Sequence, residues 1–274
     1  MIAFAPYPAR FSAARLFDDA SRVLSTAWRP LLIGVLLLGM APVVVANLPW
    51  WKATTSTASF AVIRAEIVSA RAATILVAYS AMGTFVTAVS IGVLDERGWS
   101  VRLRPAPLAA GFLASLAVAL LANWPILIEP FALLTAAQPD RGSILTLLLT
   151  LTTLASDLLL PPFVGLAVSV ATREAAPVGR SMVRSVRLLR GLRWRMFGFA
   201  LVYFVVQAIG QYAVAIPLFY SGVSYTVPGW GRAAVSLPAT LIGALAIPIF
   251  VSFYLQARRR TDGPSVAELE EAFA

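Results

Sequence analysis

Six long apolar runs constrain what this chain can fold into more than any other feature. Each is near or above the roughly 20 residues that cross the hydrocarbon core of a bilayer as an α-helix. The runs cover residues 31–50, 72–94, 108–132, 144–170, 196–220 and 233–257. They predict an all-α protein, a polytopic transmembrane helix bundle of about six spans with cytoplasmic amphipathic helices. The whole chain, residues 1–274, is predicted to form a single integral membrane domain.

The composition fits a surface that faces lipid. Hydrophobic residues make up 59% of the chain and charged residues only 13%, so a water-soluble fold would lack polar surface. The chain has no cysteine and no histidine. This excludes disulfides, thiolate nucleophiles, Cys/His zinc sites and histidine general bases. We therefore expect a protein that is not an enzyme, with no catalytic residue, no metal site and no cofactor.

The basic residues fall unevenly between the two sides of the predicted bundle. One side receives four in residues 1–30, three in 95–107, seven in 171–195 and three after residue 257, and the other side receives only five. Because basic loops stay in the cytoplasm, both termini are predicted to be cytoplasmic. The net charge of +9 then favours an anionic membrane surface as partner, with no nucleic acid, since no nucleic-acid motif accompanies the charge.

Two of the basic segments have the spacing of amphipathic helices. The apolar face of the first comprises Leu16, Ala20, Val23, Leu24 and Ala27, and that of the second comprises Val178, Met182, Val186, Leu189 and Leu192. Such helices are predicted to lie flat at the lipid headgroups with the apolar face towards the lipid.

The second of these segments is predicted to hold a lipid or phosphate site. Its candidate binding residues are Arg180, Arg184, Arg187, Arg190 and Arg195. Each arginine near an anionic leaflet contributes about 1 kcal/mol to binding. The alternative is that these arginines only set the topology and anchor the segment at the interface, as the positive-inside rule already requires.

Asp157 lies inside the fourth run, shortly before Pro161 and Pro162. A carboxylate within a span costs roughly 2.5–3.5 kcal/mol on insertion scales. The two prolines cannot donate to the carbonyls of Asp157 and Leu158, so the helix is predicted to break or kink there. Because transporters build ion sites at broken helices, Asp157, Pro161 and Pro162 form a possible ion site. The alternative is a kink beside an aspartate that faces the protein interior, a water or an arginine.

The second run carries hydroxyl side chains along one stripe. Ser80, Thr84 and Thr87 share this stripe, and Gly83 lies beside them. Small and hydroxyl-bearing residues let membrane helices approach closely and hydrogen-bond to one another. This helix is therefore predicted to lie inside the bundle, or to line a polar path.

The segment after the fourth run and the end of the chain carry a resemblance. The residues concerned are Ala176, Pro177, Arg184, Ser185, Leu188, Gly191 and Trp194, and then Tyr254, Arg258, Gly263 and Phe273. They resemble an uncharacterised family of six-span bacterial membrane proteins, which is similar to the membrane domain of some glycerophosphodiester phosphodiesterases. The resemblance implies an all-helical domain of the bacterial inner membrane with no established activity. The phosphodiesterase activity is not carried over, because the chain has no histidine for that chemistry.

Two functions remain open. The first is a non-enzymatic inner-membrane protein that binds membrane lipids, anionic ones by preference, and acts in envelope organisation or as a subunit beside another membrane protein. The second is a small ion- or proton-coupled transporter or channel that uses Asp157 at the Pro161–Pro162 break. A lipid-modifying enzyme is the least favoured class, given the missing histidines and cysteines.

Overall fold

The computed structural model describes residues 11–47, 60–94, 104–135, 139–220 and 228–262, and every element in these ranges is a helix. In chain order the elements are α1 (Ala13–Gly34), the π-helix η1 (Val35–Met40), α2 (Ala41–Asn47), α3 (Phe60–Leu94), α5 (Pro105–Thr135), α6 (Pro139–Leu159), α7 (Pro161–Val164), α8 (Ala167–Glu174), α9 (Val178–Leu188), α10 (Arg193–Tyr220) and α12 (Pro228–Asp262). The predicted all-α helix bundle is confirmed.

Five helices among the described residues are long and apolar enough to cross a membrane, counting α1, η1 and α2 as one. The bent helix from α6 to α8 adds a sixth if it is taken as one span. The spans differ in how far the protein encloses them. In α3, 61% of the most apolar stretch is buried, against 6% in α10. The inside of the bundle is therefore at α3, and α10 lies on its outside.

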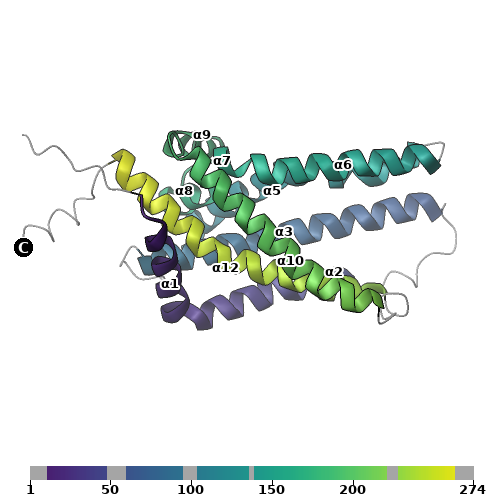
Figure 1. The fold of residues 1–274 in the computed structure, drawn as a ribbon, viewed down its shortest axis with the longest axis horizontal. Coiled ribbons are helices and arrows are strands. Elements are labelled where there is room, and N and C mark those ends of the chain that lie inside the picture. The colour runs from purple at the N-terminus through teal and green to yellow at the C-terminus, as the bar shows by residue number, and fades with distance from the viewer. Residues whose placement is uncertain (1–10, 48–59, 95–103, 136–138, 221–227, 263–274) are drawn as a thin grey trace, which may run out of the picture.

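The long helices run roughly along the long axis of the molecule (Figure 1). The central helix α3 contacts α1, α2, α5, α8 and α12, and α10 packs along α12. The first part of α1, together with α8, α9, the start of α10 and the end of α12, gathers at one end (Figure 1). We call this the basic end, because the described arginines of segments 173–195 and 258–260 belong to it.

The helix α1 changes direction at Ala27. The backbone of this residue is not helical (φ −120°, ψ 23°), and Pro30 follows three residues later. A proline inside a helix removes one hydrogen bond and crowds the preceding turn, which accounts for the kink. The first part of α1 lies across the basic end, and the chain beyond the kink runs along the bundle (Figure 1).

The first part of α1 buries the face that its sequence predicts, but it buries it in protein. Leu16 and Val23 are 3% and 0% exposed, and they pack in apolar clusters with side chains of α3 and α12. A hydrogen bond of 2.5 Å from the Ser252 hydroxyl to Asp19 Oδ2 fixes the same helix to α12. The expectation that this face lies against lipid is therefore wrong: helix spacing identifies the apolar face, and α3 and α12 cover it.

Candidate functional site

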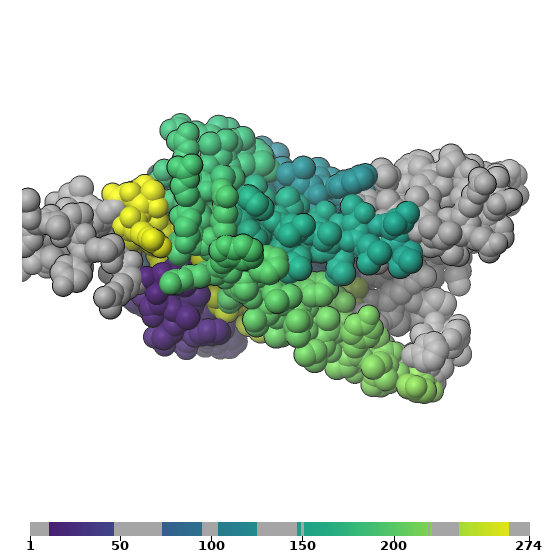
Figure 2. All heavy atoms as spheres, turned by 45° about the horizontal axis from the view of Figure 1, so that its top comes forward, coloured from purple at the N-terminus to yellow at the C-terminus, as the bar shows by residue number. Residues whose placement is uncertain are grey.

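The helix α9 crosses the basic end at the surface of the molecule, beside the end of α12 (Figure 2). It packs against α5, α7, α8 and α12. Its fully enclosed positions are Ser181, Ser185 and Leu188, which recur at spacings of four and three residues. The apolar face predicted for this segment, including Val178, is only partly buried within the helix, whereas Leu189 beyond its end is fully buried. Two small serines and Leu188 thus form the enclosed face of α9, a face that the apolar pattern did not indicate.

The buried Ser185 closes the break between α7 and α8. Its hydroxyl donates to the Phe163 carbonyl at 3.1 Å and accepts from the Leu166 amide at 3.2 Å. Both backbone groups lie beside a turn of the chain, where the helix leaves them without a partner of its own. Gly165 is required in this turn, because an added Cβ would lie 2.7 Å from the Pro161 carbonyl oxygen and 2.6 Å from Met196 Cε.

The predicted helix break is present, but the main bend comes later. Helix α6 ends before Leu160 and α7 begins at Pro161. The segment Leu151–Val164 nevertheless keeps one direction, and the 44° bend separates it from Ala167–Glu174. The prolines therefore interrupt the hydrogen bonding, whereas the turn at Gly165 changes the direction of the chain.

Asp157 lies near the end of α6 with an exposed side chain. Tyr203 of α10 is near enough to interact electrostatically with this carboxylate. No hydrogen bond or ion pair joins Asp157 to another residue of the described ranges. Asp157 thus faces the outside of the described bundle beside the break at Pro161 and Pro162, whereas Pro162 itself is buried. The possible ion site stays a prediction.

Arg184 joins three helices at the basic end. Its Nε lies 2.7 Å from Glu174 Oε1 of α8, and its Nη2 lies 2.5 Å from Asp262 Oδ2 at the end of α12. Burial alone lowers the pKa of the Arg184 guanidinium, but the hydrogen bonds and charges of the two carboxylates outweigh it and raise the pKa. Tyr254 also donates to Glu174 Oε1, at 3.4 Å. Arg184 is therefore engaged with acidic groups of the protein itself.

Buried leucines anchor the turn between α9 and α10 in the bundle. Leu188, Leu189 and Leu192 are at most 2% exposed and belong to the apolar cluster of the basic end. Gly191 has a φ of 84°, in the left-handed region that glycine adopts without strain. Arg190, between Leu189 and Gly191, is exposed, as is Arg187 just before the first of these leucines.

Two further arginines follow the turn and stack on aromatic rings. The guanidinium of Arg193 lies 5.0 Å from the centre of the Phe163 ring, and that of Arg195 lies 5.0 Å from the Phe11 ring. Trp194 between them is 86% exposed, as expected for an indole that inserts among lipid headgroups. We call the set of Arg187, Arg190, Arg193, Trp194 and Arg195 the arginine corner.

The structure thus divides the predicted lipid-binding residues. Arg187, Arg190 and Arg195 belong to the arginine corner. Arg180 is exposed near the start of α9, about 10 Å along the helix axis from Arg187, and Arg184 is held by its two carboxylates. Sequence reasoning left out Arg193, although its position in the same basic run was the available signal.

The predicted interior position of the hydroxyl stripe is confirmed. Ser80, Thr84 and Thr87 of α3 are at most 3% exposed. On the same side, α5 and α8 meet so closely that a Cβ on Gly111 would lie 2.2 Å from Thr172 Oγ1. Such close approach between membrane helices requires small residues. The stripe therefore lies in a tightly packed part of the bundle.

The number, length and apolarity of these helices define the chain as a multi-pass integral membrane protein. The chain matches no family model, no curated protein and no solved structure. The resemblance to the membrane domain of glycerophosphodiester phosphodiesterases therefore stays a prediction. Its residues Gly263 and Phe273 lie outside the described ranges.

Proposed function

We propose that this membrane protein binds anionic lipid headgroups at its basic end through the arginine corner. Arginine recognises phosphate with a planar fork of donors, and each basic residue near an anionic leaflet contributes about 1 kcal/mol. Arg180 adds to the same field from the start of α9. The role is non-enzymatic, in organising the bacterial envelope or as a subunit beside another protein of the inner membrane.

The observation that carries the proposal is the difference between Arg184 and the arginine corner. Arg184 is neutralised by Glu174 and Asp262. The arginines of the corner form no ion pair with any residue in the described ranges, yet the backbone beneath them is fixed by buried leucines. Because this backbone is already ordered, only side-chain freedom is lost when an anion binds, and phosphate groups at the membrane surface are the anions within reach of these arginines.

The proposal is tested by the double variant Arg187→Gln/Arg190→Gln. The purified protein is stripped of lipid, and phosphatidylglycerol or phosphatidylcholine is added back before native mass spectrometry. Two arginines at about 1 kcal/mol each predict a loss of phosphatidylglycerol affinity of roughly 30-fold. Phosphatidylcholine binding should change little, because that headgroup carries no net charge.

The matched control is Arg141→Gln/Arg232→Gln. These arginines lie near the starts of α6 and α12, at the ends that the sequence places on the opposite side of the membrane, and the variant carries the same change in net charge. It should bind phosphatidylglycerol as the unmodified protein does. Equal losses in both variants would show that only total charge matters and would overturn the proposal.

The transporter or channel function of Asp157 has weaker support. The helix break and the bend at Gly165 favour it, since broken helices mark ion sites in transporters. The exposure of the Asp157 side chain on the outside of the described bundle does not, because such sites line an enclosed, water-filled path.

A further inference from the structure

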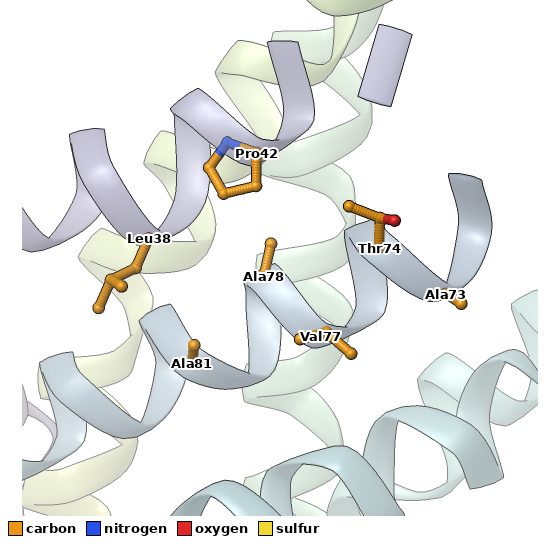
Figure 3. A pocket seen from close by; sticks show the side chains of 7 residues that line it. All are labelled: Leu38, Pro42, Ala73, Thr74, Val77, Ala78 and Ala81. Atoms are coloured by element: carbon orange, nitrogen blue, oxygen red, sulfur yellow. The ribbon is translucent and has the colours of Figure 1, made fainter. Parts of the chain in front are cut away.

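A groove runs between the first span and α3 (Figure 3). One of its lining residues, Pro42, belongs to α2, which lies away from the basic end (Figure 1). The volume of the groove is about 430 Å³. Leu38 and Pro42 form one wall, and Ala78 and Ala81 of α3 stand opposite them (Figure 3).

The local sequence of both walls explains why the groove exists. Pro42 has no amide hydrogen for the carbonyl of Leu38, and the chain widens into the π-turn η1 just before it, where the Ala41 amide bonds back to the Leu36 carbonyl. Such widened turns accommodate the hydrogen bond that a proline removes. On α3, alanines leave the facing space unfilled.

The two helices touch on one side of the groove and separate on the other. An added Cβ would lie 2.3 Å from the Phe85 ring at Gly34 and 2.5 Å from Met82 Sδ at Gly39, so the walls are in close contact there. Beyond these glycines the groove continues along α3 as far as Ala73, a rise of about 12 Å from Ala81.

We propose that this groove binds one acyl chain of a membrane phospholipid. Its walls belong to two membrane-spanning helices, and among its described lining residues none is charged and Thr74 alone is polar. At this depth the surrounding medium is hydrocarbon. An unfilled apolar groove there forfeits the dispersion contacts that a chain of methylene groups supplies.

The size of the groove decides between an acyl chain and a helix of another protein. Two turns of an α-helix about 10–12 Å wide occupy roughly 1,000 Å³, more than twice the volume of the groove. An acyl chain is thinner, is flexible enough to follow the taper and is present on all sides of a membrane protein. This site is separate from the arginine corner, and it binds an acyl chain where the arginine corner binds a headgroup.

The experiment uses vesicles of phosphatidylcholine doped with a phosphatidylcholine whose acyl chain carries a diazirine. After irradiation, cross-linked positions are mapped by peptide mass spectrometry. Residues 38–42 and 73–81 should react about tenfold more than the exposed Val202 and Ile209 of α10. This ratio corresponds to a preference for the groove of about 1.4 kcal/mol. Because the probe has no net charge, this result is independent of lipid binding at the arginines.

The variant Ala78→Leu/Ala81→Leu fills the groove, and Ala213→Leu on the exposed face of α10 is its matched control. Filling should abolish the preference for residues 73–81, whereas the control should keep it. Equal labelling of the groove and of the other exposed helices in the unmodified protein would by itself overturn the proposal. Preference that persists in the filled variant would overturn it too.

Discussion

Arg184 differs from the other arginines of α9 in what surrounds it. It bridges carboxylates of α8 and α12, and its own side chain is about 31% exposed. At this exposure solvent screens the ion pairs, so their contribution to stability is modest, about 1 kcal/mol. Its role is to position α9, and through α9 the arginine corner.

The substitution Arg184→Gln should loosen the attachment of α9 to α12. We expect faster amide hydrogen exchange in α9 and a free energy of unfolding lower by about 1 kcal/mol. Arg184→Lys should restore only part of this, because an ammonium group lacks the fork that reaches both carboxylates. Hydrogen exchange and thermal unfolding in detergent measure the two effects.

Arg187→Gln is the control for this prediction, since Arg187 forms no ion pair with a described residue. It should leave the exchange of α9 unchanged. If both variants accelerate exchange equally, Arg184 has no positioning role.

The sequence could not separate Arg184 from its neighbours. Helical spacing shows which residues share a face, and by that measure Arg184 and Arg187 are alike. The acidic partners lie 10 and 78 residues away along the chain, and no local pattern connects them. The arginine segment was thus predictable as a basic surface, but its internal division depended on tertiary contacts.

Ser185 shows the same limit at the scale of a helix. The break at Pro161 and Pro162 follows from a local rule, the missing amide hydrogen of proline. The bend at Gly165 depends on a hydroxyl from α9, which is 19 residues beyond Leu166. Local rules therefore located the interruption of the fourth apolar run but not the direction the chain takes after it.

The substitution Ser185→Ala should destabilise the junction of α7, α8 and α9. It leaves the buried Leu166 amide without its partner, which costs about 1–3 kcal/mol. Thermal unfolding in detergent should show the loss, and hydrogen exchange should accelerate in residues 163–170.

Ser25→Ala is a suitable comparison. Among the described residues, the Ser25 hydroxyl bonds only to the Arg22 carbonyl of its own helix, and it is exposed, so its removal should change stability by a few tenths of a kcal/mol at most. Indistinguishable effects of the two alanine variants would contradict the bridging role of Ser185.

At the scale of the whole molecule, the bundle of apolar helices was predictable because length and apolarity are local properties. The position of the first part of α1 was not. Its apolar face fits lipid as well as protein by spacing alone, and only the presence of α3 and α12 decides between them. The interior position of the hydroxyl stripe of α3 was predictable, since small and hydroxyl-bearing residues let membrane helices approach closely.

The side of the membrane that the basic end faces is open to a direct test, because the chain has no native cysteine. Cysteines are introduced singly by Gly179→Cys, where an added Cβ meets nothing within 4 Å, and by Ser224→Cys. In intact bacterial cells a membrane-impermeant maleimide should label position 224 at once and position 179 only after lysis. The reverse order would refute the predicted cytoplasmic orientation.

The enclosed position of α3 also has a consequence for how the chain is made. A ribosome delivers α3 before α5, α8 and α12 exist to cover its hydroxyl face, so that face must wait in the translocon or in lipid. Two hydroxyl side chains of α3 have a hydrogen-bond partner before any other helix arrives. Thr84 donates to the Ser80 carbonyl at 2.8 Å and Ser90 to the Val86 carbonyl at 2.7 Å, both within α3. Hydroxyls that bond back along their own helix make this nascent span tolerable to the membrane until its neighbours arrive.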